Sequence, residues 1–425
     1  MTEGPSRVKR WIGLLGAYFT AQSLTQLAGV LAGILVVRHL TVGDFALYTL
    51  ASSVTALLAI ASDLGSTSSL LHFYRGAESR GERFADYVGA VLELRRTAFA
   101  VGSVAFLVAA PFVGAARGFG RAESLAAAGI VLVTVWCQIG SSIRLVLLRL
   151  AARYGAAYRA ELGGGLLRLG VIGLLVVLAR LSSLAALAVG ALAAILVLAL
   201  ADSSAAHPER GEPAGRKLAK RAVGRYLLPT LPSALYFAVQ GPLVIWLAAT
   251  FGNTRSIAEV GALGRLAMIV GLLSGLSGAI LVPRLAGIAD PRSFVASFLR
   301  YGALLAALAG SLWLSAALLP NLFLAVLGPH YRGLRHELLL LIAGAGLSVL
   351  GAFVANVNLS RGWTRLQAAA LAGEVSVQAA LVATLHLSTT AGVIWFQVGG
   401  ATAGIVFQLA IFVVGIRRPA WASWH

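Results

Sequence analysis

Long apolar runs alternate with short polar ones along the chain, and the apolar runs predict membrane-spanning helices. A helix needs about 20 mostly apolar residues to cross the hydrocarbon core. Twelve segments meet this requirement, at roughly 12–37, 45–71, 91–114, 123–147, 157–179, 182–201, 227–250, 257–282, 296–319, 337–358, 364–386 and 391–415. The sequence therefore predicts an all-α polytopic membrane protein.

The composition supports a membrane protein and argues against other classes. Of 425 residues, 59% are hydrophobic and 12% are charged, which is too little polar surface for a soluble domain of this length. The chain has 34 Lys and Arg residues against 16 Asp and Glu residues, but they lie in short loops between apolar runs. Basic loops on one side of a membrane explain the excess, so we expect no nucleic-acid partner.

No motif for cofactor or metal chemistry stands out. Cys137 is the single cysteine, so internal disulfides and Cys-based metal sites are excluded. The chain has no P-loop, and its histidines and acids show no metal-ligand spacing. We therefore expect no cofactor, no metal and no enzymatic activity.

The distribution of basic residues predicts the orientation of the helices. With the N-terminus inside, and with charges in the first six residues of a segment counted with the preceding loop, 24 Lys and Arg residues fall in inner loops and tails and seven fall in outer loops. Five of the inner ones belong to the connection between the second and third segments, Arg95 and Arg96 among them. Because the cytoplasmic side is normally the more basic one, both termini are predicted to be cytoplasmic. The first apolar run reaches Val37, too long for a cleavable signal peptide, and is read as a retained helix.

The longest polar stretch divides the helices six and six. It reads ADSSAAHPERGEPAGRKLAKRAVGR, residues 201–225, a composition typical of a flexible basic linker. We expect an N-terminal lobe at 1–201, a cytoplasmic linker at 202–226 and a C-terminal lobe at 227–425. The halves echo each other weakly, as TVGDFALY opens the second segment and SIAEVGAL the eighth. A parallel repeat with a central site between the halves is therefore predicted.

Three stretches resemble a known transporter family. They are VVRHLTVGDFALYTLASSVTALLAIASDLGSTSSLLHF, IAEVGALGRLAMIVGLLSGLSGAILVPRLAG and LFLAVLGPHYRGLRHELLLLIAGAG. Each is similar to the corresponding part of the polysaccharide-transporter and O-antigen (Wzx-type) flippase family, within the multidrug/oligosaccharidyl-lipid/polysaccharide exporter superfamily. The last includes a turn, Gly328-Pro329-x-Tyr331, that is typical of the family.

The resemblance implies two six-helix lobes around a central cavity. Family members move undecaprenyl-diphosphate-linked sugars from the inner to the outer leaflet of the bacterial cytoplasmic membrane. The implied partners are the lipid-linked oligosaccharide, the lipid bilayer and other polysaccharide-assembly proteins. Related lipid II flippases usually have fourteen helices, so twelve helices disfavour that subfamily.

Two other functions are alternatives to a flippase. A multidrug/cation antiporter of the same superfamily would line its cavity with acids, whereas only Asp63, Glu161 and Glu374 are clearly intramembrane here, against three arginines. A membrane glycosyltransferase or polysaccharide polymerase usually needs a sizeable outer loop, and the predicted outer loops are short. An anionic lipid-linked substrate is therefore favoured.

Charges inside apolar helices are the first candidates for the transport site, because each costs about 2.5–3.5 kcal/mol to insert. Arg168 lies near the predicted midplane, and Glu161 lies two turns nearer the cytoplasm on the same face. Arg144 is a candidate partner for Glu161, which would leave Arg168 for an anion, and Arg265 lies in the eighth segment. Guanidinium groups bind diphosphate bidentately. Interhelical ion pairs or snorkelling are the structural alternatives for all three arginines.

Two acids have both a coupling and a structural interpretation. Asp63 ends an apolar run in SDLGSTSSLLHFYRG, where the family places a similar stretch facing the cavity. Gly65 and the hydroxyl residues at 66–69 would then permit close helix packing and offer hydrogen bonds to a solvated lumen. Alternatively, Asp63 caps a helix break or pairs with a neighbouring arginine. Glu374, in the eleventh segment, is either a proton site or an ion-pair partner.

Two polar stripes match between the halves and are candidate sugar-binding faces. The first segment carries Phe19, Gln22, Ser23 and Gln26 at helical spacing, and the seventh carries Ser233, Tyr236 and Gln240. The seventh is interrupted by prolines at 229, 232 and 242, which would permit bending during alternating access. The alternative is that these polar residues only join helices.

Overall fold

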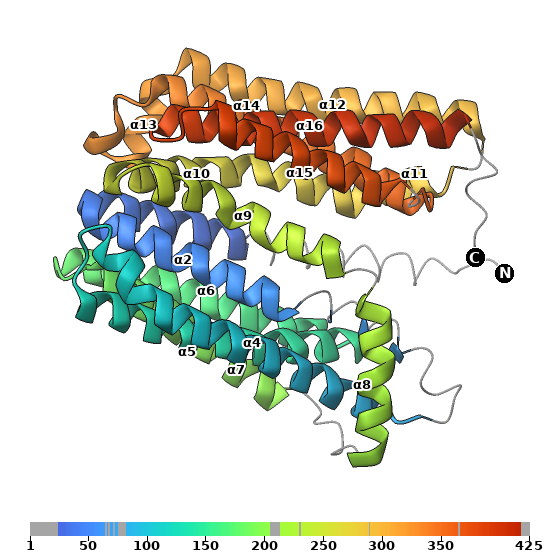
Figure 1. The fold of residues 1–425 in the computed structure, drawn as a ribbon, viewed down its shortest axis with the longest axis horizontal. Coiled ribbons are helices and arrows are strands. Elements are labelled where there is room, and N and C mark those ends of the chain that lie inside the picture. The colour runs from blue at the N-terminus through green and yellow to red at the C-terminus, as the bar shows by residue number, and fades with distance from the viewer. Residues whose placement is uncertain are drawn as a thin grey trace. The chain divides into compact units, whose positions relative to one another are not determined.

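A computed structural model describes residues 24–63, 66, 69–70, 73–74, 82–204, 213–228, 231–288, 290–363 and 366–417. These ranges are helical and contain no strand (Figure 1). Nine helices within them are long and apolar enough to cross a membrane. They are α2 (Val42–Asp63), α4 (Phe84–Ala115), α5 (Arg121–Leu150), α6 (Tyr154–Val177), α7 (Ser183–Ser204), α10 (Thr254–Leu276), α12 (Pro291–Leu318), α14 (Arg335–Ser360) and α16 (Thr390–Arg417).

The remaining predicted segments correspond to shorter described helices. These are the helix Leu24–His39, α9 (Leu231–Phe251) and α15 (Gln367–Thr384). The helices often run past the apolar segments into charged sequence; α4, for example, begins at Phe84 rather than near residue 91. The prediction of an all-α polytopic membrane protein is confirmed.

The segment predicted as a flexible linker contains a helix, which corrects that interpretation. The helix α8 (Pro213–Leu227) buries Ala219 and Val223 in a cluster with Tyr87, Val88 and Val91 of α4. The basic composition of this segment conceals the apolar stripe that allows it to fold onto a neighbour.

The chain groups into two compact units, Met1–Pro242 and Leu243–His425. The division falls inside α9, whereas the lobe boundaries expected at 201 and 227 stay a prediction. In the first unit, α5 and α6 both pack against α7. In the second, one buried cluster joins α11 (Val282–Ala286), α12, α14 and α16 through side chains such as Leu285, Phe298, Phe353 and Phe412.

The predicted eighth segment is a helix with an irregular end. After α10 the chain forms a π-helical turn, Ser277–Leu281, and then α11. The start of α10 is capped by Asn253, whose side chain accepts a hydrogen bond from the Ser256 N–H at 2.9 Å. Asp290 caps α12 in the same way, with Ser293 N–H at 2.8 Å and Pro291 in the first turn. These caps satisfy backbone donors that a helix N-terminus leaves unpaired.

The connection between α12 and α14 is also ordered. It contains α13 (Pro320–Leu327) and a 3₁₀ turn, Pro329–Tyr331, joined at Gly328. Gly328 has φ of 108°, a conformation that side chains with a Cβ rarely adopt. The turn buries Tyr331 to 2% exposure, so this part of the sequence positions an aromatic residue against the helices.

Candidate functional site

Arg168 lies well inside the apolar helix α6 and contacts a second helix. Its guanidinium Nη2 donates a hydrogen bond to the Tyr48 hydroxyl of α2 over 2.5 Å. Tyr48 is only 1% exposed and stacks on Phe45, with ring centroids 6.1 Å apart. The contact joins α2 to α6 and fixes one part of the half-buried guanidinium.

The rest of the Arg168 guanidinium has spare hydrogen-bonding capacity. Its Nε is buried and donates no hydrogen bond in the described part of the chain. Arg168 forms no ion pair with a described residue; the ion pairs that do form include Arg95–Asp63, Arg144–Asp202, Arg149–Glu161, Lys220–Glu93 and Arg255–Glu259. A guanidinium has five donors and stays charged, and a cation without a counter-charge is costly away from water. This arrangement is suited to an incoming anion.

The helix Leu24–His39 passes close to Gly165, three residues before Arg168 on α6. A Cβ atom on Gly165 would lie 3.6 Å from Thr25 Cγ2 and 3.7 Å from Ala28 Cβ, so the two helices approach closely there. Gln26 is exposed on the same short helix. Of the first predicted polar stripe, the structure thus describes only Gln26, on a helix that packs against α6. Phe19, Gln22 and Ser23 lie outside the described residues.

Asp63 forms an ion pair with Arg95, as the structural interpretation of Asp63 expects. Arg95 is 2% exposed in α4, and it also donates to Ser66 Oγ at 2.7 Å and to Ser142 Oγ of α5 at 2.6 Å. Arg95 was not among the predicted site residues. The helix α4 continues through the sequence ELRR at residues 93–96. The position of Arg95 directly before a long apolar run was the sequence feature that could have identified it as a residue inside the helix.

The predicted pairing of Arg144 with Glu161 is wrong. Arg144 pairs with Asp202 of α7, while Glu161 of α6 accepts a hydrogen bond from Arg149 at 2.7 Å. Arg144 and Arg149 lie five residues apart on α5, a rotation of about 140° around the helix axis. They therefore face different neighbours, and the sequence spacing of single residues does not reveal which helix each one meets.

In the second unit, the polar contacts centre on Glu259 of α10. Arg255 donates to its carboxylate at 2.7 Å, and the Thr390 hydroxyl of α16 donates at 2.6 Å. Burial, together with the negative charge of Glu259, raises the pKa of Tyr331 to about 12. Glu259 was not among the predicted site residues, although it lies in SIAEVGAL, the stretch that matches TVGDFALY of the first half. Arg265 lies half-buried on the same helix.

Three amide side chains form a network that the sequence did not indicate. Asn358 is fully buried and donates to both the backbone oxygen and the Oε1 of Gln408, at 2.9 and 3.0 Å. Gln408 in turn donates to Gln367 Oε1 at 3.1 Å. The network joins α14, α15 and α16, and single amides in apolar helices were the signal that could have found it.

The other predicted site residues lie in α15 and α9. Glu374 lies half-buried on α15, where a Cβ atom on Gly404 of α16 would be 3.5 Å from its Oε1. Tyr236 and Gln240 are half-buried on α9. The side chain of Ser233 lies outside the described residues.

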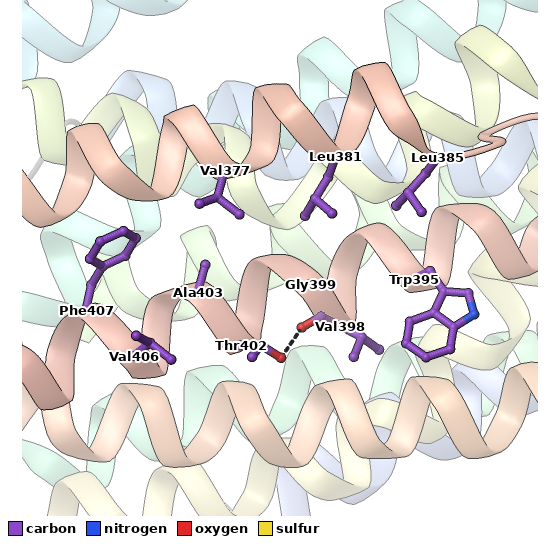
Figure 2. Close-up of a pocket in the computed structure, with 10 residues that line it drawn as sticks. All are labelled: Val377, Leu381, Leu385, Trp395, Val398, Gly399, Thr402, Ala403, Val406 and Phe407. Atoms are coloured by element: carbon purple, nitrogen blue, oxygen red, sulfur yellow. Dashed lines mark hydrogen bonds between the residues drawn. The ribbon is translucent and has the colours of Figure 1, made fainter.

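An apolar groove of about 440 Å³ runs between α15 and α16 (Figure 2). Its walls include Leu381 and Leu385 from α15 and Trp395, Val398 and Thr402 from α16. The Thr402 hydroxyl donates to the Val398 carbonyl at 2.8 Å, so it is satisfied within its own helix. The groove therefore offers contacts to a hydrocarbon chain and little to a charged group.

Within the described ranges, no group of three or more His, Cys, Asp or Glu side chains is placed to hold a metal ion. The site chemistry that these residues offer is hydrogen bonding, ion pairing and apolar contact.

Solved structures show which fold this is, although no family model and no curated protein matches the sequence. The structure is similar to an inward-facing multidrug resistance MATE family transporter of the MOP superfamily, with a TM-score of 0.71 at 16% identity over 94% of this chain and 95% of the other. It is similar to the lipid II flippase MurJ in an inward closed conformation, with a TM-score of 0.74 at 11% identity over 94% and 87%. A MOP superfamily transporter from Pyrococcus furiosus gives 0.56 at 14% identity over 95% and 94%. The chain has the two-lobed fold of these transporters.

Proposed function

We propose that this protein is a flippase that moves a lipid-linked oligosaccharide, carried on undecaprenyl diphosphate, from the inner to the outer leaflet by alternating access. The observation that carries the proposal is Arg168, a cation inside an apolar helix with one polar contact to Tyr48 and no ion-pair partner among the described residues. The fold likeness to MATE transporters and to MurJ supports a transport function.

The geometry of Arg168 suits a diphosphate. Tyr48 holds one end of the guanidinium, and the remaining N–H groups can donate two parallel hydrogen bonds to phosphate oxygens. The sugars would follow the diphosphate through a polar path, because stranding their hydroxyls in hydrocarbon costs several kcal/mol per group. The polyprenyl tail would stay in lipid or in the apolar groove between α15 and α16.

The antiporter alternative receives less support from the charges. A cation exporter needs carboxylates available to its substrate. Of the three intramembrane acids expected from the sequence, Asp63 and Glu161 each pair with an arginine, as Glu259 also does, which leaves Glu374 as the candidate acid for a cation. Pairing neutralises the first three acids, whereas Arg168 has no acidic partner among the described residues. We also propose that the protein resides in the bacterial cytoplasmic membrane with both termini in the cytoplasm, and that it contacts other polysaccharide-assembly proteins.

A binding experiment on the purified full chain tests the proposal. We expect a polyprenyl-diphosphate-linked disaccharide to bind in neutral detergent more tightly than its monophosphate analogue and than the cation tetraphenylphosphonium. Arg168→Gln should weaken diphosphate binding by roughly 10- to 100-fold, the range for a lost charged hydrogen bond, and Arg168→Lys should weaken it less. Arg332→Gln, at an exposed site, is the control. Tighter binding of the cation, unaffected by Arg168→Gln, would support the antiporter instead.

A further inference from the structure

The basic helix α8 has two different faces. Ala219 and Val223 are buried against α4, and Lys220 donates to Glu93 of α4 at 2.8 Å. The opposite face, called here the basic face, consists of Lys217, Leu218, Arg221, Gly224 and Arg225, all exposed. At about 100° per residue these five positions fall within roughly one third of the helix circumference.

The basic face combines cations with an exposed apolar side chain. Lys217, Arg221 and Arg225 take part in none of the ion pairs among the described residues. Leu218, between them, is 67% exposed, and Leu228, just past the end of the helix, is 69% exposed. Water alone would suit the cations but not the leucines, whereas a lipid headgroup region suits both.

The length of α4 places α8 at the level of the membrane surface. The helix α4 has 32 residues, or about 48 Å, whereas the hydrocarbon core is about 30 Å thick. Its charged residues, Asp86, Glu93, Arg95 and Arg96, all precede residue 97, and the sequence from 97 to 115 has none. The first third of α4 therefore lies near the headgroups, and that is the part on which α8 packs. Figure 1 shows α8 running across the direction of α4, as a helix lying along a membrane surface would.

We propose that the basic face of α8 binds the headgroups of anionic phospholipids, with Leu218 and Leu228 entering the boundary between headgroups and acyl chains. Each lysine or arginine near an anionic membrane surface raises the affinity for that surface roughly fivefold. Three such cations on one face hold α8 against the surface of the leaflet that it faces. This inference holds whatever molecule the protein transports.

A fluorescent reporter on the full chain tests the inference. A Cβ atom on Gly224 would meet nothing within 4 Å, so Gly224→Cys in a Cys137→Ala background can carry an environment-sensitive NBD label on the basic face. The labelled protein is reconstituted into vesicles of phosphatidylcholine alone, or of phosphatidylcholine and phosphatidylglycerol in equal parts. We expect a shift to shorter emission wavelength in the mixed vesicles, and loss of the shift near 1 M salt, where the Debye length is about 3 Å.

Matched variants separate the basic face from net charge. Lys217→Gln, Arg221→Gln and Arg225→Gln combined should abolish the shift. Arg38→Gln, Arg180→Gln and Arg332→Gln combined remove the same charge from other exposed positions and should preserve it.

Three results would overturn the inference. One is equal emission of the unsubstituted protein in both lipid mixtures, a comparison that does not depend on how any charge variant folds. Another is an undiminished shift in the basic-face variant. The third is the same shift produced in phosphatidylcholine vesicles by soluble glycerol phosphate, which would indicate a site for free phosphate.

Discussion

Arg95 and Arg168 show how the partners of a membrane arginine decide its role. Both lie within long apolar helices, but Arg95 is surrounded by Asp63, Ser66 and Ser142, whereas Arg168 has Tyr48. A guanidinium whose donors are satisfied by the C-terminal end of α2 and by α5 ties both of them to α4. One with spare donors can take a ligand instead.

The Arg95–Asp63 pair is therefore expected to stabilise the fold. Arg95 is buried whereas Asp63 is 34% exposed, so stranding Arg95 is the costlier change. Asp63→Leu, which leaves a buried charge unpaired, should therefore unfold at a markedly lower temperature, with a typical cost of up to about 3–5 kcal/mol, and Arg95→Met should lower it less. Asp63→Leu combined with Arg95→Met should recover much of the loss, because no charge is then left unpaired. Thermal unfolding of the single and double variants in detergent checks this. A double variant as unstable as the sum of the single variants would contradict the pairing.

Tyr331 makes stability depend on alkaline pH. Burial and the nearby Glu259 charge raise its pKa in the folded protein to about 12, above the usual value near 10. A raised pKa means that the folded state holds the proton more tightly, so this contribution is complete below pH 10 and is lost as the pH rises toward 12. Tyr331→Phe should flatten the fall in melting temperature over that window. An identical pH profile in the variant would show that other groups cause it.

Helix packing depends on glycines at particular positions. Along α6, a Cβ atom on Gly164 would lie 2.4 Å from Val197 Cγ2 and 3.3 Å from the Ala193 carbonyl oxygen of α7. A Cβ atom on Gly173 of the same helix would meet nothing within 4 Å. The two glycines therefore have different roles, although both occur in similar apolar sequence.

This difference predicts opposite effects of the same substitution. Gly164→Ala should lower stability by about 1–3 kcal/mol through overpacking against α7. Gly173→Ala should be neutral or slightly stabilising, because alanine has the higher helix propensity. Membrane abundance and melting temperature of the two variants give the comparison. Equal effects would mean that α6 and α7 are not in close contact at Gly164.

The sequence predicts the helices better than it predicts their contacts. Apolar runs of about 20 residues identified the spans, because the bilayer allows few other structures. They missed α8, whose apolar stripe is short, and they placed the partner of Glu161 on the wrong turn of α5. A change of one or two residues around a helix turns a side chain toward a different neighbour. Arg168 could be singled out in advance, but its contact with Tyr48, 120 residues away, could not.

A transporter for an anionic lipid should respond to the membrane potential. A diphosphate carries roughly two negative charges, and each is worth about 2.3 kcal/mol per 100 mV, so an inside-negative potential favours outward movement by at most about 4–5 kcal/mol per 100 mV. Export in vesicles should fall when the potential is set to zero and should be less affected when only the pH gradient is removed. Undiminished export at zero potential, with loss in Glu374→Gln, would instead make Glu374 a proton-coupling residue.

Movement of the lipid itself is the decisive observation. The purified protein is reconstituted into vesicles that carry a fluorescent polyprenyl-diphosphate-linked oligosaccharide, and a membrane-impermeant quencher reports how fast the label changes leaflet. The unsubstituted protein and Arg332→Gln should accelerate this movement, and Arg168→Gln should slow it at least about tenfold, the factor for a loss of 1.4 kcal/mol. No acceleration by the unsubstituted protein, together with uptake of a cationic dye into the same vesicles, would contradict the proposed flippase function.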